Sequence, residues 1–162
     1  MWAKSDKFAP VLRQDSLRLL TSLAVSSRRP LRQGDCTNAF CQGVLPPEEL
    51  TIVRPPSGDP EAAPDEYWLL KRTLYGLRRS PRHWCDKINS ILISIGLTPS
   101  LEDPCLYTGF LCDPNNPSAV PTCSPLSLGL YVDDFVYFSP DPAVERLFCC
   151  LLSERCQLTS WV

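Results

Sequence analysis

The sequence lacks the features that mark several common classes of protein. Met1–Lys7 has no apolar core of the kind found in secretory signal peptides, and no apolar run in the chain is long enough to span a bilayer. Nine cysteines are present, but no two form a Cys-x-x-Cys pair, and the single histidine, His83, is far from any cysteines with zinc-ligand spacing. We therefore expect an intracellular protein, cytoplasmic or nuclear, with free thiols, no membrane partner and no secretion. A metal site made of Cys105, Cys112 and Cys123 is a minor alternative.

The net charge is small, but the charged residues are unevenly distributed. The 162 residues have a formal net charge of −2, which by itself favours no partner. Residues 1–33 hold seven lysines or arginines and two aspartates, and residues 71–87 hold six basic residues and one acid. Residues 45–66 hold six acids and one arginine. Basic surface in some segments and acidic surface elsewhere suits a protein that binds nucleic acid, and an ordinary mixed surface is the alternative.

Two adjacent carboxylates, Asp133 and Asp134, lie between the apolar segments Leu128–Leu130 and Phe135–Phe138. This order predicts a hairpin of two strands with an acidic turn. Carboxylates repel each other and are costly to bury without a partner, so the pair calls for a cation. Mg²⁺ is the natural candidate, because it takes carboxylate oxygens together with water and phosphates. Simple turn chemistry, in which an aspartate bonds its own backbone, is the alternative.

A third carboxylate, Asp35, follows a short segment, residues 30–34, that can form the end of a strand. Three carboxylates that converge from two strands would make a two-metal site. In such a site one ion activates an attacking hydroxyl, and both ions stabilise an in-line displacement at phosphorus.

Hydrophobic spacing predicts three helices and several short strands. Asp15–Ser16 and Ser80–Pro81 indicate helix starts, the second with serine as N-cap and proline as the first helical residue. Residues 45–66, rich in proline and acid, predict an irregular connection with at most a brief strand at 50–53. His83 falls opposite the apolar stripe of its helix, so it is expected to face solvent or a phosphate. The helices are expected near 15–27, 80–96 and 142–156, and the strands near 30–35, 67–70, 105–110, 128–130 and 135–138, with a loop at 113–125.

This order of elements predicts an α+β fold in which helices pack on one face of an antiparallel sheet. The other face would then be free to hold nucleic acid. The length suits one compact domain or a part of a larger one.

Four blocks of the sequence resemble the reverse transcriptase domain of copia-type long-terminal-repeat retrotransposons. The longest and most distinctive block, Leu70–Trp84, is similar to the family's template-contacting block, and Tyr131–Asp134 is similar to its acidic hairpin. Gly34–Phe40 resembles the first catalytic block, and Phe8–Leu20 resembles the entry to the first palm helix. The blocks follow the family's order over residues 8–155.

The resemblance implies a polymerase palm with part of the fingers, and DNA synthesis from an RNA or DNA template-primer and deoxynucleoside triphosphates. Asp35 and Asp133 would be the principal catalytic ligands of two Mg²⁺ ions, for which Mn²⁺ can substitute. Asp134 would complete the acidic cluster. The primer's 3′-hydroxyl would attack the α-phosphate of the incoming deoxynucleotide, and pyrophosphate would leave.

The resemblance also implies binding residues around this cluster. Phe40 would lie beneath the sugar and exclude a ribose 2′-hydroxyl, with an ordinary core phenylalanine as an equal alternative. Tyr75 and Gly76 would line the nucleotide and template pocket, where glycine permits close approach of the backbone, and Tyr131 would lie near the primer end. The side chains implied to contact nucleic-acid phosphates, with a solvated basic helix entry as the alternative, are Lys71, Arg72, Arg78, Arg79 and Arg82.

The chain differs from the family's full pattern at both ends. Seven residues precede Phe8, where the family carries a basic fingers segment. Residues 157–162 form a divergent tail, where the family continues with a further palm strand, a thumb and a ribonuclease H domain. We therefore expect residues 1–162 to be a truncated reverse transcriptase domain without a thumb, with integrase and ribonuclease H regions as neighbours in a polyprotein. The alternative is an inactive transposon remnant that at most binds nucleic acid nonspecifically. In isolation, the chain is expected to extend a primer weakly or not at all.

Overall fold

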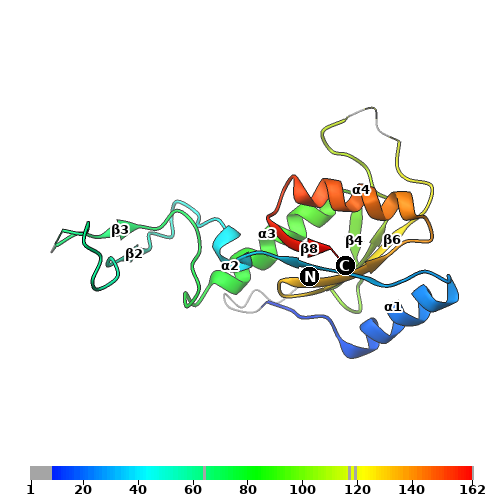
Figure 1. Cartoon of the computed structure of the whole chain (residues 1–162), viewed down its shortest axis with the longest axis horizontal. Helices are drawn as coiled ribbons and strands as arrows, with labels where there is room; N and C mark the ends of the chain where they lie inside the picture. Colours follow the sequence, from blue (N-terminus) through cyan, green and yellow to red (C-terminus); the bar gives the residue numbers. More distant parts are fainter. Residues whose placement is uncertain (1–8, 64, 117, 119, 162) are drawn as a thin grey trace.

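A six-stranded antiparallel sheet organises most of the chain (Figure 1). The computed structural model describes residues 9–63, 65–116, 118 and 120–161, so Phe8 of the first matching block and Val162 of the tail lie outside the described residues. Across the sheet the strand order is β4, β5, β6, β7, β1, β8. The strands are β1 (Arg32–Cys36), β4 (Leu97–Pro99), β5 (Leu106–Gly109), β6 (Leu126–Tyr131), β7 (Asp134–Phe138) and β8 (Leu158–Trp161). A mixed architecture with an antiparallel sheet, as predicted, is confirmed.

Helices lie on both faces of this sheet. Two of the three long helices pack on one face and the remaining one packs on the other (Figure 1). In the described part of the chain, none of the helices has the length and apolarity that a membrane crossing requires. The helices are α1 (Gln14–Ser26) on one face, α3 (Ser80–Ser94) and α4 (Pro142–Ser153) on the other, and the short α2 (Ala39–Gln42) after β1.

The prediction that helices cover one face only is wrong, because α1 has an apolar stripe of its own to bury. Leu20 and Ala24 on this stripe pack against Phe138 of β7, on the face that the sequence left open. At the hairpin end of the same face, Tyr131 and Asp134 stay exposed. Open surface on this face is therefore available beside the acidic turn but not along its whole length.

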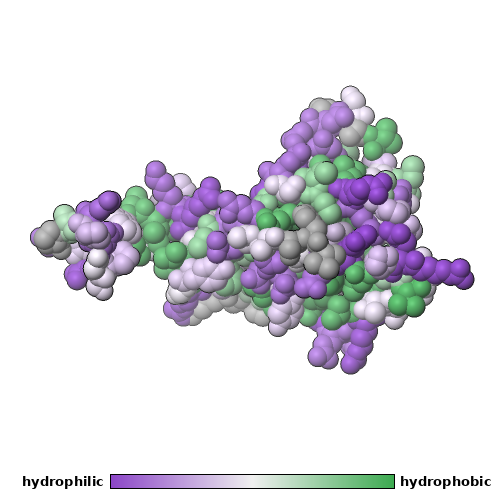
Figure 2. Space-filling model, viewed as in Figure 1, coloured by the Kyte–Doolittle hydropathy of each residue, from purple (hydrophilic) through white to green (hydrophobic). Residues whose placement is uncertain are grey.

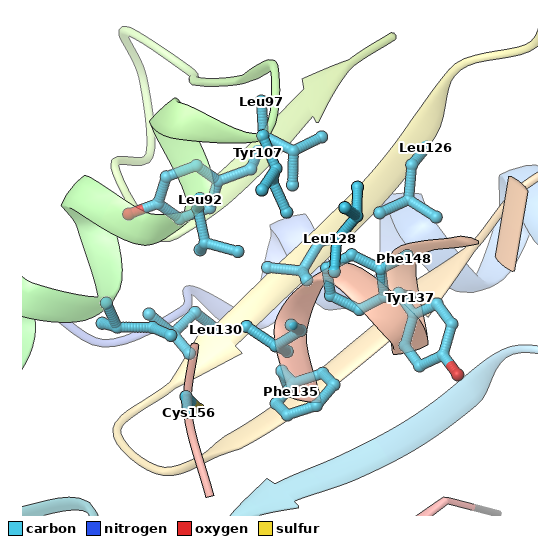
Figure 3. Packing of buried hydrophobic residues seen from close by; sticks show 14 of the residues in the cluster. Leu92, Leu97, Tyr107, Leu126, Leu128, Leu130, Phe135, Tyr137, Phe148 and Cys156 are labelled. Carbon is cyan, nitrogen blue, oxygen red and sulfur yellow. The ribbon is translucent and has the colours of Figure 1, made fainter. Parts of the chain in front are cut away.

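Alternating residues of β6 project to opposite faces of the sheet. The leucines at 126, 128 and 130 join the larger core with α3 and α4, and Figure 3 shows Leu128 and Leu130 beside Phe135, Tyr137 and Phe148. Gly129 points the other way, where a Cβ atom would lie 2.6 Å from Leu12 and 2.8 Å from Leu20. The absence of a side chain at Gly129 thus lets α1 approach the sheet closely. The predicted stripe of the middle helix is buried in the larger core through Trp84, Ile88, Leu92 and Ile95.

The proline-rich connection projects from this body as an arm (Figure 1). Its two short strands, β2 (Ile52–Val53) and β3 (Trp68–Leu69), pair with each other and form a separate two-stranded sheet. Of the brief strand expected at 50–53, Ile52–Val53 is a strand, and the strand expected at 67–70 is reduced to Trp68–Leu69. Apolar side chains on the arm remain exposed, among them Ile52 and Leu69 (Figure 2).

The segment predicted to be a divergent tail contains a strand. β8 pairs with β1, with Asp35 opposite Ser160 and Cys36 opposite Leu158. The register shifts between Asp35 and Cys36, which is the signature of a bulge or irregularity. β8 has only four residues, too few for the sequence to indicate a strand, and its pairing partner β1 lies more than 120 residues away along the chain.

Neither Asp15–Ser16 nor Ser80 caps its helix as predicted. α1 begins at Gln14, and Ser16 lies inside it with its hydroxyl donating to Asp103 Oδ2 at 2.5 Å. The backbone N–H of Arg13 donates to the same oxygen at 2.9 Å. Asp103, from a loop far along the chain, therefore accepts hydrogen bonds at the start of α1, where a local side chain was predicted to do so.

In α3, Ser80 is the first helical residue, and Arg79 occupies the N-cap position. The Ser80 hydroxyl instead donates to the carbonyl of Leu74 at 2.6 Å. This bond joins the first residue of α3 to the turn that precedes the helix. The Ser80 side chain therefore stabilises that turn and does not cap the N–H groups of the helix.

We predict that Asp103→Ala lowers the free energy of unfolding by about 2 kcal/mol, because three donors lose a buried acceptor. These donors are Arg13 N–H, the Ser16 hydroxyl and Cys105 N–H. Burial alone would raise the pKa of Asp103, but these hydrogen bonds hold the pKa below its usual range. The stabilisation is therefore present at neutral pH and is lost as pH falls below the usual carboxyl pKa towards the lowered one.

Urea unfolding of both proteins at neutral and acidic pH measures this effect. The control is Asp15→Ala, which removes an exposed carboxylate from α1, the helix whose start Asp103 contacts. Equal losses in the two variants, or a loss for Asp103→Ala that does not shrink in acid, would contradict the proposed role of Asp103.

Candidate functional site

The turn between β6 and β7 holds a strained residue. Val132, the first of its two central residues, has a φ of 60°, while Asp133 has no positive φ. This is the pattern of a type II′ hairpin turn, whose first central residue is usually glycine. A β-branched residue in this conformation costs on the order of 1–3 kcal/mol and is held only where its surroundings determine the backbone. Here Trp84 of α3 supplies that restraint, since its buried indole Nε1 donates to the carbonyl of Val132 at 2.7 Å.

Strand pairing brings the three predicted carboxylates to one corner of the sheet. Asp35, near the end of β1, is the direct partner of Asp134, the first residue of β7. The backbone N–H of Cys36 donates to the carbonyl of Asp133 at 2.9 Å. Directly paired residues of antiparallel strands project to the same face, so Asp35 and Asp134 both lie on the face of the sheet that α1 partly covers.

The closeness of these carboxylates appears in their electrostatics. Burial raises the pKa of Asp134, and the negative charges of Asp133 and Asp35 raise it further. Burial also raises the pKa of the Tyr75 phenol, with additional contributions from Asp133 and Asp35. Tyr75 therefore lies within reach of the acidic corner although it is 40 residues away from Asp35 along the chain.

The donor chemistry of this corner fits Mg²⁺, whose ligands are hard oxygens. Mg²⁺ is commonly held by only one or two carboxylates, and water and substrate phosphates complete its coordination. Within the described ranges, no group of three or more histidine, cysteine, aspartate or glutamate side chains is placed so that it could hold a metal ion by itself. The corner thus offers carboxylate oxygens to an ion that substrate would help to bind, and it is not a closed protein cage.

Thr159 of β8 is a polar neighbour of this corner that the sequence did not indicate. Its hydroxyl donates to Asp35 Oδ1 at 2.7 Å and lies 2.5 Å from the Thr37 hydroxyl. The bond orients the Asp35 carboxylate and occupies one of its oxygens. No sequence signal could have identified Thr159, because it depends on the pairing of β8 with β1.

The two predicted nucleotide-binding aromatics contact each other. The ring centroids of Phe40 and Tyr75 are 5.1 Å apart. Phe40, in α2, is half-buried against the larger core, while half of the Tyr75 side chain is exposed. Gly76, at a turn closed by Leu77 N–H donating to Leu74 O, has a φ of 91° and no atom near the position of a Cβ. Glycine is therefore required at this position by the turn's backbone conformation, and the described structure shows no close approach there.

Tyr131 lies beside a small apolar cavity at the acidic corner. The residue is exposed and pairs with Asp134 across the hairpin. The cavity has a volume of about 180 Å³ and lies between the start of α1 and the sheet. Its lining includes Leu12, Leu17, Tyr131, Asp134 and Val136.

The predicted basic residues fall into two groups. Lys71, Arg72 and Arg78 are exposed at the base of the arm and the entry to α3. Arg79 and Arg82 are engaged in ion pairs, the first with Glu49 at 3.0 Å and the second with Asp86 at 2.8 Å.

The prediction that His83 faces solvent is wrong. Only 13% of its side chain is exposed, and Nε2 lies 2.8 Å from Glu49 Oε2. Helical spacing placed His83 opposite the apolar stripe, but the segment after α2 folds back over that side of α3. The resulting contact joins the base of the arm to α3.

Comparison with known proteins supports the resemblance. The family model described as reverse transcriptase (RNA-dependent DNA polymerase) matches residues 3–158. The chain is similar to the retrovirus-related Pol polyprotein from transposon RE1 of Arabidopsis thaliana, with 30% identity over 93% of this chain. It is also 33% identical, over 64% of its length, to the corresponding polyprotein from transposon RE2 of Arabidopsis thaliana. A third relative, the polyprotein from transposon TNT 1-94 of Nicotiana tabacum, is 31% identical over 83% of the chain.

The aligned regions are a small part of these relatives. They cover 10%, 7% and 9% of the polyproteins from RE1, RE2 and TNT 1-94, respectively. No solved structure shows a significant match to the chain.

We predict that Asp134→Asn raises the free energy of unfolding of the metal-free protein by about 0.5 kcal/mol at neutral pH and low salt. The substitution removes a carboxylate whose pKa is raised by burial and by its neighbours Asp133 and Asp35. Because the carboxyl pKa is higher in the folded state than in the unfolded state, ionisation destabilises the folded state. This destabilisation grows as pH rises above the usual carboxyl pKa and is still present at neutral pH. Urea unfolding as a function of pH measures the difference, which should vanish below the usual carboxyl pKa.

Mg²⁺ provides the complementary measurement. Millimolar Mg²⁺ should raise the melting temperature of the wild type more than that of Asp134→Asn, since bound cation offsets the repulsion that the variant lacks. Asp15→Asn, on the exposed side of α1, is the matched control and should behave as the wild type. Destabilisation by Asp134→Asn in the absence of metal would contradict the repulsive character of the corner.

Proposed function

Because this chain belongs to the reverse transcriptase (RNA-dependent DNA polymerase) family of retrotransposon Pol polyproteins, we propose that it forms a polymerase site that adds deoxynucleotides to the 3′-hydroxyl of a primer. One observation carries the proposal: Asp35, Asp133 and Asp134 converge at a strained hairpin turn that α3 holds in place. Strain and repulsion at the same place have no structural benefit, and both are typical of a functional site.

The finer architecture follows from this assignment. We propose that the six-stranded sheet is the polymerase palm and that the β2–β3 arm is part of the fingers. The arm then stands beside Phe40 and Tyr75, so that its movement could adjust the nucleotide pocket.

In the proposed reaction, the protein positions charges and reactants and forms no covalent bond to them. Asp35 and Asp133 would be the principal ligands of two Mg²⁺ ions, with Asp134 completing the cluster, and Mn²⁺ could replace Mg²⁺. When bound, the ions supply positive charge to the attacking hydroxyl and to the α-phosphate. Thr159 would hold the Asp35 carboxylate in a single orientation, and the exposed edge of the corner would admit the triphosphate and the primer end.

Phe40 and Tyr75 would select and position the incoming nucleotide. Their contact makes a continuous aromatic surface next to the acidic corner. The face of a ring at Phe40 would leave no room for a ribose 2′-hydroxyl and would thereby favour deoxynucleotides. Because Phe40 is also half-buried against the core, its ring has a structural role in addition to this proposed one.

Template and primer would be held by phosphate contacts and by the hairpin. Tyr131, exposed next to Asp134, would lie near the primer end. Lys71, Arg72 and Arg78 are exposed and would meet phosphates directly, whereas Arg79 and Arg82 would first have to exchange their carboxylate partners. Integrase and ribonuclease H regions would be the neighbours of this domain in a polyprotein.

A second candidate function is nonspecific nucleic-acid binding without synthesis. One observation favours it: the Asp35 carboxylate, which the proposed metal site would need as a ligand, is already engaged by Thr159. The two candidates differ in a single measurable property, which is metal-dependent extension of a primer.

We predict that the chain extends an oligo(dT) primer on poly(rA) slowly with Mg²⁺ or Mn²⁺, and that Asp133→Asn or Asp35→Asn lowers the rate at least about 100-fold. The reason is that each substitution removes a charged oxygen ligand while preserving shape. Asp15→Asn controls for loss of a carboxylate elsewhere. Extension that persists in Asp133→Asn would contradict the proposed catalytic role, and folded protein that binds template but extends nothing would favour the second candidate.

We also predict that binding to single-stranded or duplex nucleic acid weakens steeply with salt and does not depend on sequence. Replacing Lys71, Arg72 and Arg78 together by alanine should reduce the slope of log affinity against log salt by roughly 2 to 3, since three phosphate contacts are lost. Arg146→Ala, exposed on α4, is the control and should leave the slope unchanged. An unchanged slope in the triple variant, measured by fluorescence anisotropy, would contradict this nucleic-acid surface.

A further inference from the structure

We propose that Cys36 and Cys156 form a reversible disulfide, and that this modification controls the acidic corner. The two sulfur atoms lie 3.5 Å apart in the larger core, and both residues are buried. Cys36 ends β1 directly after Asp35, and Cys156 lies in the short link between α4 and β8. The two thiols are 120 positions apart in sequence, so the pair is a product of the fold.

An open cavity gives small molecules access to one member of this pair. The cavity has a volume of about 520 Å³ and is lined by Cys156, with Lys87, Arg72 and Gln42 among its other walls. Cys36 does not line it. Cys156 is therefore the thiol that an oxidant would meet first, and Cys36 lies behind it as the resolving thiol (Figure 3 shows Cys156 near the Leu130 and Phe135 end of the hairpin).

The surroundings of Cys156 favour reactivity. A hydrogen bond from Cys36 lowers the pKa of the Cys156 thiol, burial opposes this effect, and the positive charge of Lys87 lowers the pKa further. The same hydrogen bond and burial raise the pKa of Cys36, so Cys36 keeps its proton while Cys156 reacts first. By contrast, burial raises the pKa of Cys85 and raises that of Cys105 to about 12. Since the thiolate is the form that reacts with oxidants, Cys156 should react ahead of Cys85 and Cys105.

The oxidant we propose is hydrogen peroxide. The Cys156 thiolate attacks one peroxide oxygen, the O–O bond breaks, and the hydroxide that leaves takes up a proton to give water and a sulfenic acid. The Cys36 sulfur then attacks the Cys156 sulfur, and the sulfenic oxygen leaves as a second water with the Cys36 proton. Overall, two thiols lose two electrons and two protons, and one peroxide is reduced to two waters. A dithiol reagent reverses the step by thiol–disulfide exchange.

Bond formation would disturb the acidic corner. A disulfide requires the sulfurs to come to about 2.05 Å, so they must move together by roughly 1.5 Å. The register of β1 and β8 shifts between Asp35 and Cys36, and Cys36 pairs with Leu158 at the start of β8, so a displacement of Cys36 would act on both Asp35 and β8. Movement would displace the Asp35 carboxylate relative to Thr159 and Asp134. This effect on activity rests on the proposed function, whereas the disulfide rests on the thiol geometry alone.

Peptide mapping after differential alkylation tests the disulfide directly. Treatment of the folded chain with a small excess of hydrogen peroxide should produce a Cys36–Cys156 cross-link in most molecules, and dithiothreitol should remove it. Cys156→Ser and Cys36→Ala should each abolish the cross-link. A variant with Cys123→Ser and Cys150→Ser, which lacks two exposed thiols, should form it as the wild type does. Oxidation of Cys156 to sulfinic acid without the cross-link, or equal yields of other pairings, would overturn the proposal.

Primer extension and unfolding by urea distinguish formation of the disulfide from its effect on the acidic corner. Oxidation should lower the extension rate of the wild type at least tenfold, dithiothreitol should restore it, and the Cys156→Ser rate should be insensitive to peroxide. A cross-link that leaves extension unchanged would overturn the control of the site. If no extension is seen with any form, the mapping still decides whether the disulfide forms, and urea unfolding of oxidised and reduced protein shows whether the bond is compatible with the native fold.

Discussion

Two like charges held directly opposite each other on neighbouring strands impose the main constraint on this structure. The pairing of Asp35 with Asp134 is unfavourable, and Asp133 adds a third negative charge at the adjoining turn. At exposed positions such repulsion costs less than about 1 kcal/mol for each pair. Burial of a single large apolar side chain contributes about 1.5–3 kcal/mol, so the core beneath the strands is sufficient to hold the carboxylates together.

That core acts through the opposite sides of the same strands. Phe135 and Tyr137 of β7 alternate with Asp134 and Val136, so the residues that anchor the strand and the residues that form the site project to different faces. Phe148 of α4 packs against the rings of Phe135 and Tyr137 and so holds β7 on the core face of the sheet. The turn is fixed separately by the Trp84 indole, whose hydrogen bond to Val132 restrains a backbone that would otherwise relax. A slip of one residue in register would turn the anchoring residues away from the core and bury the site residues in their place. That exchange would cost more free energy than the strain at the turn, so the site keeps its position.

Sequence patterns located the hairpin, the long helices and the aspartates, because each of these depends on residues close together in the chain. Alternation around Asp133 and Asp134 determines a two-stranded hairpin locally, and the stripe from Trp84 to Ile95 determines an amphipathic helix locally. The placement of α1 was missed for a physical reason. An apolar stripe shows that a helix must be covered, but it does not state which face of a sheet covers it, and Gly129 provides the space on the second face. His83 was misplaced for a similar reason, since Glu49 reaches it from another segment.

By itself, the sequence determined the kind of protein this is: family membership, an α+β chain with an antiparallel sheet, and carboxylates suited to a hard cation, all of which are written in residue types and short spacings. Only the tertiary structure decided what surrounds those carboxylates. Asp103 as the partner of the first helix, β8 with Thr159 beside Asp35, and the contact between Cys36 and Cys156 all join residues from 87 to 124 positions apart. Such contacts leave no periodic pattern in the sequence. They depend on which backbone N–H and C=O groups at a strand edge or helix start still lack a hydrogen-bond partner after the local elements have formed. Those groups are identified only once the sheet has assembled.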